Sequence, residues 1–102
     1  MAVVYPKNGT ATPSAGTFSV VIPMVQTHGI CKQVIVRSAT SSTTFDVKII
    51  DRFSNRPFYS TSITGLINEP TDFPVFGDLT ITVENASADE EFNYTIATLT
   101  ES

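Results

Sequence analysis

The sequence has one cysteine, no tryptophan and few charged residues, and each shortage excludes something. The single thiol, Cys31, excludes an internal disulfide framework, so stability must come from packing or from partner subunits. Charged residues make up 16% of the chain, well below the usual quarter. Six basic residues stand against 10 acidic ones, and this net charge of −4 disfavours contact with a phosphate backbone. We therefore expect no nucleic-acid partner.

Long hydrophobic runs and helix-forming clusters are also missing. No apolar stretch approaches the roughly 20 residues that cross a bilayer. The N-terminus, MAVVYPKNGT, has no charged leader followed by a long apolar region. We expect a soluble, non-exported product with no membrane partner. Apolar residues do not recur at helical spacing, and Ala, Leu, Glu and Lys never cluster, which argues against helices.

Hydroxyl side chains supply most of the polarity instead. The chain holds 15 Thr and 10 Ser. Thr suits extended backbone because its Cβ is branched, and it fits the half-solvated surface of a sheet. The length of 102 residues is enough for one domain with a two-layer core. Composition alone thus favours a single all-β domain covering residues 1–102.

Alternation of apolar and polar residues marks the strands. It is clearest at residues 44–51, where Phe45, Val47 and Ile49 alternate with Asp46 and Lys48. In residues 30–36 we expect Ile30, Val34 and Val36 to face inward, with Lys32 as an exception. Further strands are expected at residues 17–25, 79–85 and 92–99, with Pro23 at an edge or a bulge. The predicted core contains Phe45, Val47, Ile49, Ile81, Val83 and Ile96.

Turn residues divide these strands. Ser54-Asn55 predicts a tight turn that joins residues 49–53 and 56–60 in a hairpin. Gly65 and the cluster at 68–70 are expected to break the next run, and residues 73–78 are interpreted as a connection. Residues 1–16 are predicted to form a polar N-terminal arm. The whole pattern predicts an antiparallel β-sandwich of about seven or eight strands, either a jelly roll or immunoglobulin-like.

Residues 43–99 carry a resemblance to a known class of protein. The residues concerned are the strand at 43–51, Pro57-Phe58-Tyr59, Thr64-Gly65-Leu66 and a closing strand that ends in Glu84-Asn85-Ala86. This pattern resembles small virion proteins of tailed bacteriophages, namely decoration (cement) or accessory head or tail proteins of jelly-roll type. The resemblance implies a structural role in a virion beside major capsid or tail proteins. It carries no site residue over to this chain.

A second reading of the same strands is a small carbohydrate- or ligand-binding module. Such modules stack sugars on a coplanar row of exposed Trp or Tyr. The chain has no Trp and three Tyr, which weighs against this alternative. A phage virion component therefore remains the first hypothesis.

Several residues are candidates for chemistry, and none forms a complete site. His28 and Cys31 are each unique, whereas a zinc site needs about four ligands and a catalytic pair needs an orienting group. The carboxylates suit a glycosidase only within a deep aromatic cleft. The acidic run at 88–91 offers oxygen ligands for calcium, although acidic turns are usually solvated. We expect a non-enzymatic protein without catalytic, cofactor-binding or metal-binding residues. The carboxylates considered are Asp46, Asp51, Asp78, Asp89, Glu90 and Glu91.

Surplus aromatic residues predict a contact surface. About half of Tyr5, Phe53, Phe58, Tyr59, Phe73, Phe76 and Tyr94 fit inside so small a core, and the others are left for the surface. Aromatic and Arg side chains are enriched at interface anchors. We expect self-association and contacts with other virion proteins through one patch. Its predicted members are Arg52, Phe53, Arg56, Tyr59 and Phe76.

Overall fold

The computed structural model describes residues 3–22, 29–51, 58–75 and 78–100. Eight strands and no helix occur in these ranges, so no described helix is available to span a membrane. The strands are β1 (Val3–Ala11), β2 (Phe18–Ile22), β3 (Gly29–Ser38), β4 (Thr44–Asp51), β5 (Phe58–Thr64), β6 (Leu66–Val75), β7 (Leu79–Glu84) and β8 (Phe92–Thr100). The predicted all-β class is confirmed.

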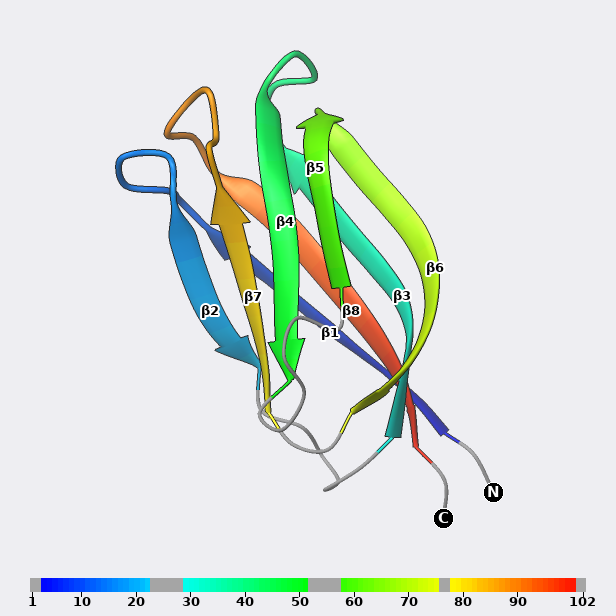
Figure 1. The fold of residues 1–102 in the computed structure, drawn as a ribbon. Helices are drawn as coiled ribbons and strands as arrows, with labels where there is room; N and C mark the ends of the chain where they lie inside the picture. The colour runs from blue at the N-terminus through cyan, green and yellow to red at the C-terminus, as the bar shows by residue number, and fades with distance from the viewer. Residues whose placement is uncertain (1–2, 23–28, 52–57, 76–77, 101–102) are drawn as a thin grey trace.

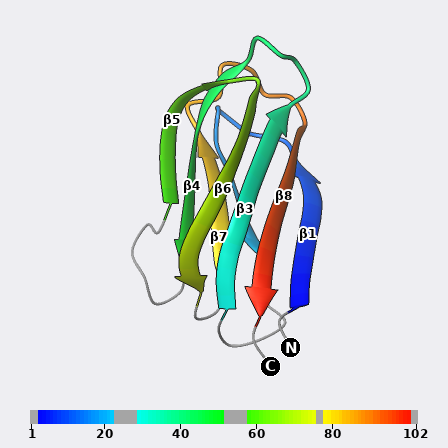
Figure 2. The same ribbon diagram turned by 90° about the vertical axis from the view of Figure 1, so that its right-hand side faces the viewer.

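Two antiparallel sheets of four strands pack face to face (Figures 1 and 2). Sheet I has the order β1-β8-β3-β6, and sheet II has the order β2-β7-β4-β5. The chain therefore pairs its first strand with its last, its second with the seventh, its third with the sixth and its fourth with the fifth. A long hairpin rolled up on itself gives this nesting, which is the jelly-roll order. The sequence left the jelly-roll and immunoglobulin-like strand orders open, and the structure has the jelly-roll order.

The core lies between the inner faces of the two sheets. All six predicted core residues are at most 1% exposed, which confirms the faces assigned to β4, β7 and β8. Phe92 of β8 packs edge-on against Phe45 of β4, with ring centroids 4.9 Å apart, and also touches Phe18 of β2. Such tilted aromatic pairs add to the stabilisation from burial. They fasten sheet I to sheet II near the ends of the strands.

A β-bulge in β3 corrects the faces predicted for that strand. Cys31 pairs with Thr98 of β8 and Gln33 pairs with the adjacent Ala97, so Lys32 has no pairing partner on β8. The extra residue shifts the alternation by one, because side chains alternate with a period of two. Cys31 is therefore buried on the same face as Val34, while Lys32 reaches Asp72 at 3.1 Å. The sequence interpretation had placed Cys31 on the outer face.

Two segments that the sequence predicted to be irregular contain strands in the structure. Residues 1–16 were predicted as a polar arm, yet Val3–Ala11 pairs with β8 along its whole length. The break at 68–70 and the connection at 73–78 were also wrong for residues 66–75, which form β6 against β3. Both are border strands of sheet I, where proline and polar residues are tolerated because one side of the backbone makes no ladder bonds. Ladder pairing requires no alternation of apolar side chains.

The pairing of β4 with β5 is confirmed, but a tight Ser54-Asn55 turn would set Ile49 opposite Ser60, whereas Ile49 pairs with Phe58. The turn at Ser54-Asn55 lies outside the described residues, as do Pro23 and residues 52–57. Near Asp46, β5 contains one extra residue, and Ser62 adopts a positive φ of 56°. Asp46 Oδ1 accepts the backbone N–H of Ser62 at 2.9 Å and so fixes this bulge.

Candidate interaction surfaces

The four connections that the structure describes gather at one end of the sandwich (Figure 1). We call this the loop end, and it comprises residues 12–17, 39–43, 65 and 85–91. The connections bond to one another across the two sheets. Gly65 N–H donates to Thr43 at 2.8 Å, and Ala86 N–H donates to Gly16 at 3.0 Å. The loop end is therefore one hydrogen-bonded unit.

Asp89 holds the β1–β2 turn. Ala15 and Gly16 both have positive φ, 55° and 80°, which identifies a type I′ turn closed by Ser14 and Thr17. The Asp89 carboxylate accepts the N–H of Ala15 at 3.2 Å and that of Gly16 at 2.9 Å. Two successive N–H groups aimed at one anion form a small nest. This carboxylate is thus a clamp between loops.

Glu90 plays the same part for the β3–β4 loop. Its carboxylate accepts the Thr40 hydroxyl at 2.7 Å, the Thr40 N–H at 3.1 Å and the Thr43 hydroxyl. The hydrogen bond from Thr43, followed by that from Thr40, lowers the pKa of Glu90 below the ordinary glutamate value. Run 88–91 was considered as a calcium site or a solvated turn. In the structure, two of its three carboxylates serve as internal acceptors.

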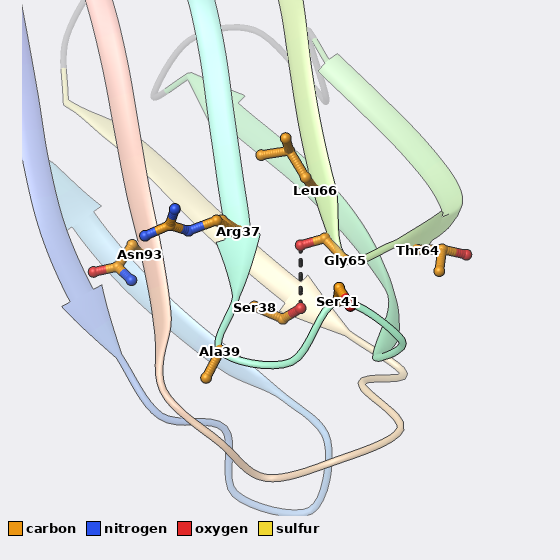
Figure 3. Close-up of a pocket in the computed structure, with 8 residues that line it drawn as sticks. All are labelled: Arg37, Ser38, Ala39, Ser41, Thr64, Gly65, Leu66 and Asn93. Carbon is orange, nitrogen blue, oxygen red and sulfur yellow. Dashed lines mark hydrogen bonds between the residues drawn. The ribbon is translucent and has the colours of Figure 1, made fainter.

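A shallow pocket of about 370 Å³ opens beside the loop end (Figure 3). Its floor includes Gly65, whose carbonyl accepts the Ser38 hydroxyl at 3.1 Å. Arg37 and Asn93 supply polar groups on one side, and Leu66 supplies an apolar wall. This lining suits a carbonyl or carboxylate oxygen next to an apolar group, the chemistry of a neighbouring protein chain.

The thiol proposed as half of a catalytic pair is inaccessible. Cys31 is fully buried, and burial raises the pKa of its thiol against the lowering effect of the Thr71 hydroxyl 3.3 Å away. A thiol held protonated is a poor nucleophile and metal ligand. Its full burial suits a cysteine that acts as a small hydrophobic residue. His28 lies outside the described residues. Within the described ranges no three His, Cys, Asp or Glu side chains gather as a metal site would require.

Of the predicted contact patch, only Tyr59 can be located. Its side chain is 50% exposed on β5, a border strand of sheet II, opposite Lys48 of β4. Arg52, Phe53, Arg56 and Phe76 lie outside the described residues, so their grouping with Tyr59 stays a prediction. Phe58, Phe73 and Tyr94 from the aromatic surplus are half-buried against the core.

Exposed apolar side chains follow the borders of both sheets. Three large apolar residues stand out among the described ones: Val21 is 60% exposed, Leu66 51% and Tyr59 50%. They lie on β2, β6 and β5, and each of these strands ends its sheet. Neither Val21 nor Leu66 was among the predicted contact residues. Val21 was visible as the outward residue of the 17–25 alternation, but nothing in the sequence indicated that its strand has a neighbour on one side only.

No protein-family model matches the sequence, and no curated protein matches it. Several solved structures match at low identity and with TM-scores below 0.5. The infectious bursal disease virus Gx strain structure matches at 9% identity and a TM-score of 0.42, over 97% of this chain and 31% of that chain. The crystal structure of the VP2 subviral particle of the same virus matches at 13% identity and a TM-score of 0.45, over 98% and 32%.

A bacterial protein matches at a similar level. It is Aeromonas hydrophila PliG, described as a periplasmic inhibitor of g-type lysozyme, with 17% identity and a TM-score of 0.38 over 95% of this chain and 84% of that chain. The present chain spans about a third of the length of the viral chains. At these identities and scores the similarities carry no argument about this chain.

Proposed function

We propose that this chain is a non-enzymatic structural component of a virus particle, a decoration, cement or accessory head or tail protein, that acts through protein–protein contacts. The observation that carries the proposal is the position of Val21, Tyr59 and Leu66 on border strands. A border strand offers unpaired backbone groups beside such side chains, which together recruit neighbouring chains. Self-association and docking on a major capsid or tail protein both use this chemistry.

The fold supports the same role by analogy. Jelly rolls serve as viral capsid domains, and also as lectins and cupins. The fold is therefore compatible with a capsid role but does not by itself select it. The resemblance of residues 43–99 to phage virion proteins favours the first of these uses. The virion is then the site of action, after synthesis in the host cytoplasm.

The carboxylates at the loop end support a non-catalytic role. A general acid or base needs a carboxyl group that is free to meet substrate and has a pKa near the working pH. Asp89 and Glu90 instead accept hydrogen bonds from the backbone and hydroxyl groups of other loops. The carbohydrate alternative has less support, because Tyr59 is the only aromatic residue that is exposed among those whose side chains the structure describes. One ring is too little for a row of stacked sugars.

Particle composition tests the proposal. Particles from cells that make this chain are banded in a density gradient, washed in high salt and analysed by mass spectrometry. We expect the chain in a constant ratio to the major shell protein, with an abundant host cytoplasmic protein as the control for trapping. Recovery of the chain only in the particle-free fraction, at the control's level in the bands, contradicts the proposal.

A further inference from the structure

The four border strands differ in how they are protected against pairing with another chain. Natural sheets guard their borders with proline, charge or bulges. On β1, Pro6 lacks an N–H group, and Lys7 pairs with the buried Ile96 and so lies on the core-facing side. On β6, Pro70 and Pro74 interrupt the donors, and the register shifts between them.

The remaining borders belong to sheet II, and one of them is guarded. On β5 the extra residue beside Ser62, held by Asp46, bends the strand out of regular register. The other border is β2, Phe18–Ile22, which contains no proline, no charge and no bulge; Pro23, which follows it in the sequence, lies outside the described residues. Its register with β7 is continuous from Phe18–Val83 to Ile22–Leu79. Among the described strands β2 pairs with β7 alone, so no described strand occupies the other side of this regular strand.

The row of the outer face that leads to this border is uncharged. Val21 pairs with Thr80 of β7, and Thr80 pairs with Ile50 of β4, which gives a row of three β-branched side chains leading to the border. Elsewhere on that face Lys48 and Glu84 pair with each other at 3.3 Å. No residue of β2 is charged, so two β2 strands can approach without like charges meeting on the paired strands.

We infer that β2 pairs with β2 of a second copy of this chain in antiparallel orientation across a twofold axis. An antiparallel strand pair is self-complementary under twofold symmetry, so one exposed strand provides both halves of the contact. The two four-stranded sheets II become one sheet of eight strands. This inference rests on the proposed structural role and names one partner within it.

The contact is small. Five residues per chain bury less surface than a permanent dimer needs, so the pair is weak and depends on concentration. A weak contact suits a particle component, because many copies held on one shell meet at a high effective concentration. Free protein then stays mostly dissociated until it is docked or concentrated.

Sedimentation velocity of the whole chain from about 10 µM to about 1 mM tests the pairing. We expect a reversible monomer–dimer equilibrium. Val21→Lys, which adds a charge at the border, should weaken dimerisation by about tenfold or more. Thr61→Lys is the matched control, an exposed β-branched residue on the guarded β5 border given the same charge. It should leave the equilibrium unchanged, and Val21→Thr should nearly preserve it, because a β-branched residue is retained.

Hydrogen exchange of the unmodified chain tests the pairing without any substitution. Amides of β2 that point away from β7 should slow as concentration rises, while amides of β5 and β6 keep their rates. A chain that stays monomeric to about 1 mM overturns the inference, as does a dimer equally sensitive to Thr61→Lys or one without protection in β2. If the chain is monomeric but is found in the particle bands, the β2 pairing is wrong and the proposed function stands. If the chain dimerises but is absent from the particle bands, the β2 pairing stands and the proposed function is wrong.

Discussion

Asp89 Oδ1 lies 2.9 Å from the backbone nitrogen of Gly16, a residue 73 positions earlier in the chain. The bond joins the β7–β8 loop to the β1–β2 turn and so ties the two ends of the rolled hairpin together. Its partner bond from Ala15 uses the other carboxylate oxygen. One acidic side chain thereby satisfies two successive donors of a turn that has no helix or sheet partner for them.

Loss of this clamp should destabilise the fold. Asp89→Ala removes an ionised acceptor from two N–H groups, and we expect the free energy of unfolding to fall by about 1–2 kcal/mol. Glu91→Ala is the matched control, because Glu91 is exposed, lies two positions away and changes the net charge equally. Its effect should stay within about 0.5 kcal/mol. Urea unfolding measures both, and equal losses would show that charge alone accounts for the effect.

Glu90 should make stability depend on pH in the acid range. Its folded-state pKa is lowered by the Thr43 and Thr40 hydrogen bonds, so the folded chain holds this proton less tightly than the unfolded chain. The stabilisation is complete above the ordinary glutamate pKa and is lost as pH falls through the lowered value. Urea midpoints of the unmodified chain and Glu90→Gln should therefore differ at pH 7 and converge in acid. A constant difference between pH 7 and pH 3 would contradict this origin.

Gly65 should tolerate substitution less well than Gly16. Both have positive φ, 75° and 80°, but a Cβ at position 65 would lie 2.5 Å from the backbone oxygen of Ser41. At position 16 the nearest atom, the oxygen of Ala86, is 3.1 Å away. We expect Gly65→Ala to cost about 2 kcal/mol or more and Gly16→Ala about 1 kcal/mol. Thermal and urea unfolding rank the two variants, and the reverse order would contradict the crowding at Gly65.

Val83 tests the core. Its side chain is fully buried on β7, so Val83→Asp places a carboxylate among apolar groups at a cost of several kcal/mol. That is comparable with the roughly 5–15 kcal/mol by which a domain is stable, and we expect the variant to be unfolded. Thr80→Asp on the outer face of the same strand should stay folded. Circular dichroism and melting cooperativity decide, and a cooperatively folded Val83→Asp protein would overturn the position of β7.

The hairpin between β4 and β5 remains the predicted docking element. Phe53→Ala combined with Arg56→Ala should weaken assembly while leaving the β-rich circular dichroism spectrum in place, since truncating an anchor typically costs about 2 kcal/mol or more. Tyr59→Ala, at an exposed site on β5, should act in the same direction. Pull-down of particles or partner protein measures the effect. Unchanged affinity would move the contact elsewhere, and loss of folding would place these side chains in the core.

The local sequence pattern was sufficient to predict the strands that have a neighbouring strand on each side, such as β4 and β7. Phe45, Val47 and Ile49 alternate with other residues because one face of β4 lies in the core. This alternation is visible in residues that are adjacent in the sequence. The same holds for Ile81 and Val83 of β7. The β-sandwich class and its core followed from this alone. The contact patch rested instead on composition, and of its members the structure locates only Tyr59.

Tertiary structure decided everything that depends on which strand lies beside which. The sequence by itself determined the period of two, the turns and the low charge. Pairing of β1 with β8, 87 residues apart for Asn8 and Thr95, has no local signal, and neither does the bulge that turns Cys31 inward. Whether a strand is a border is likewise a property of the sheet. Val21 is proposed as a contact residue only because β2 has β7 on one side and no described strand on the other.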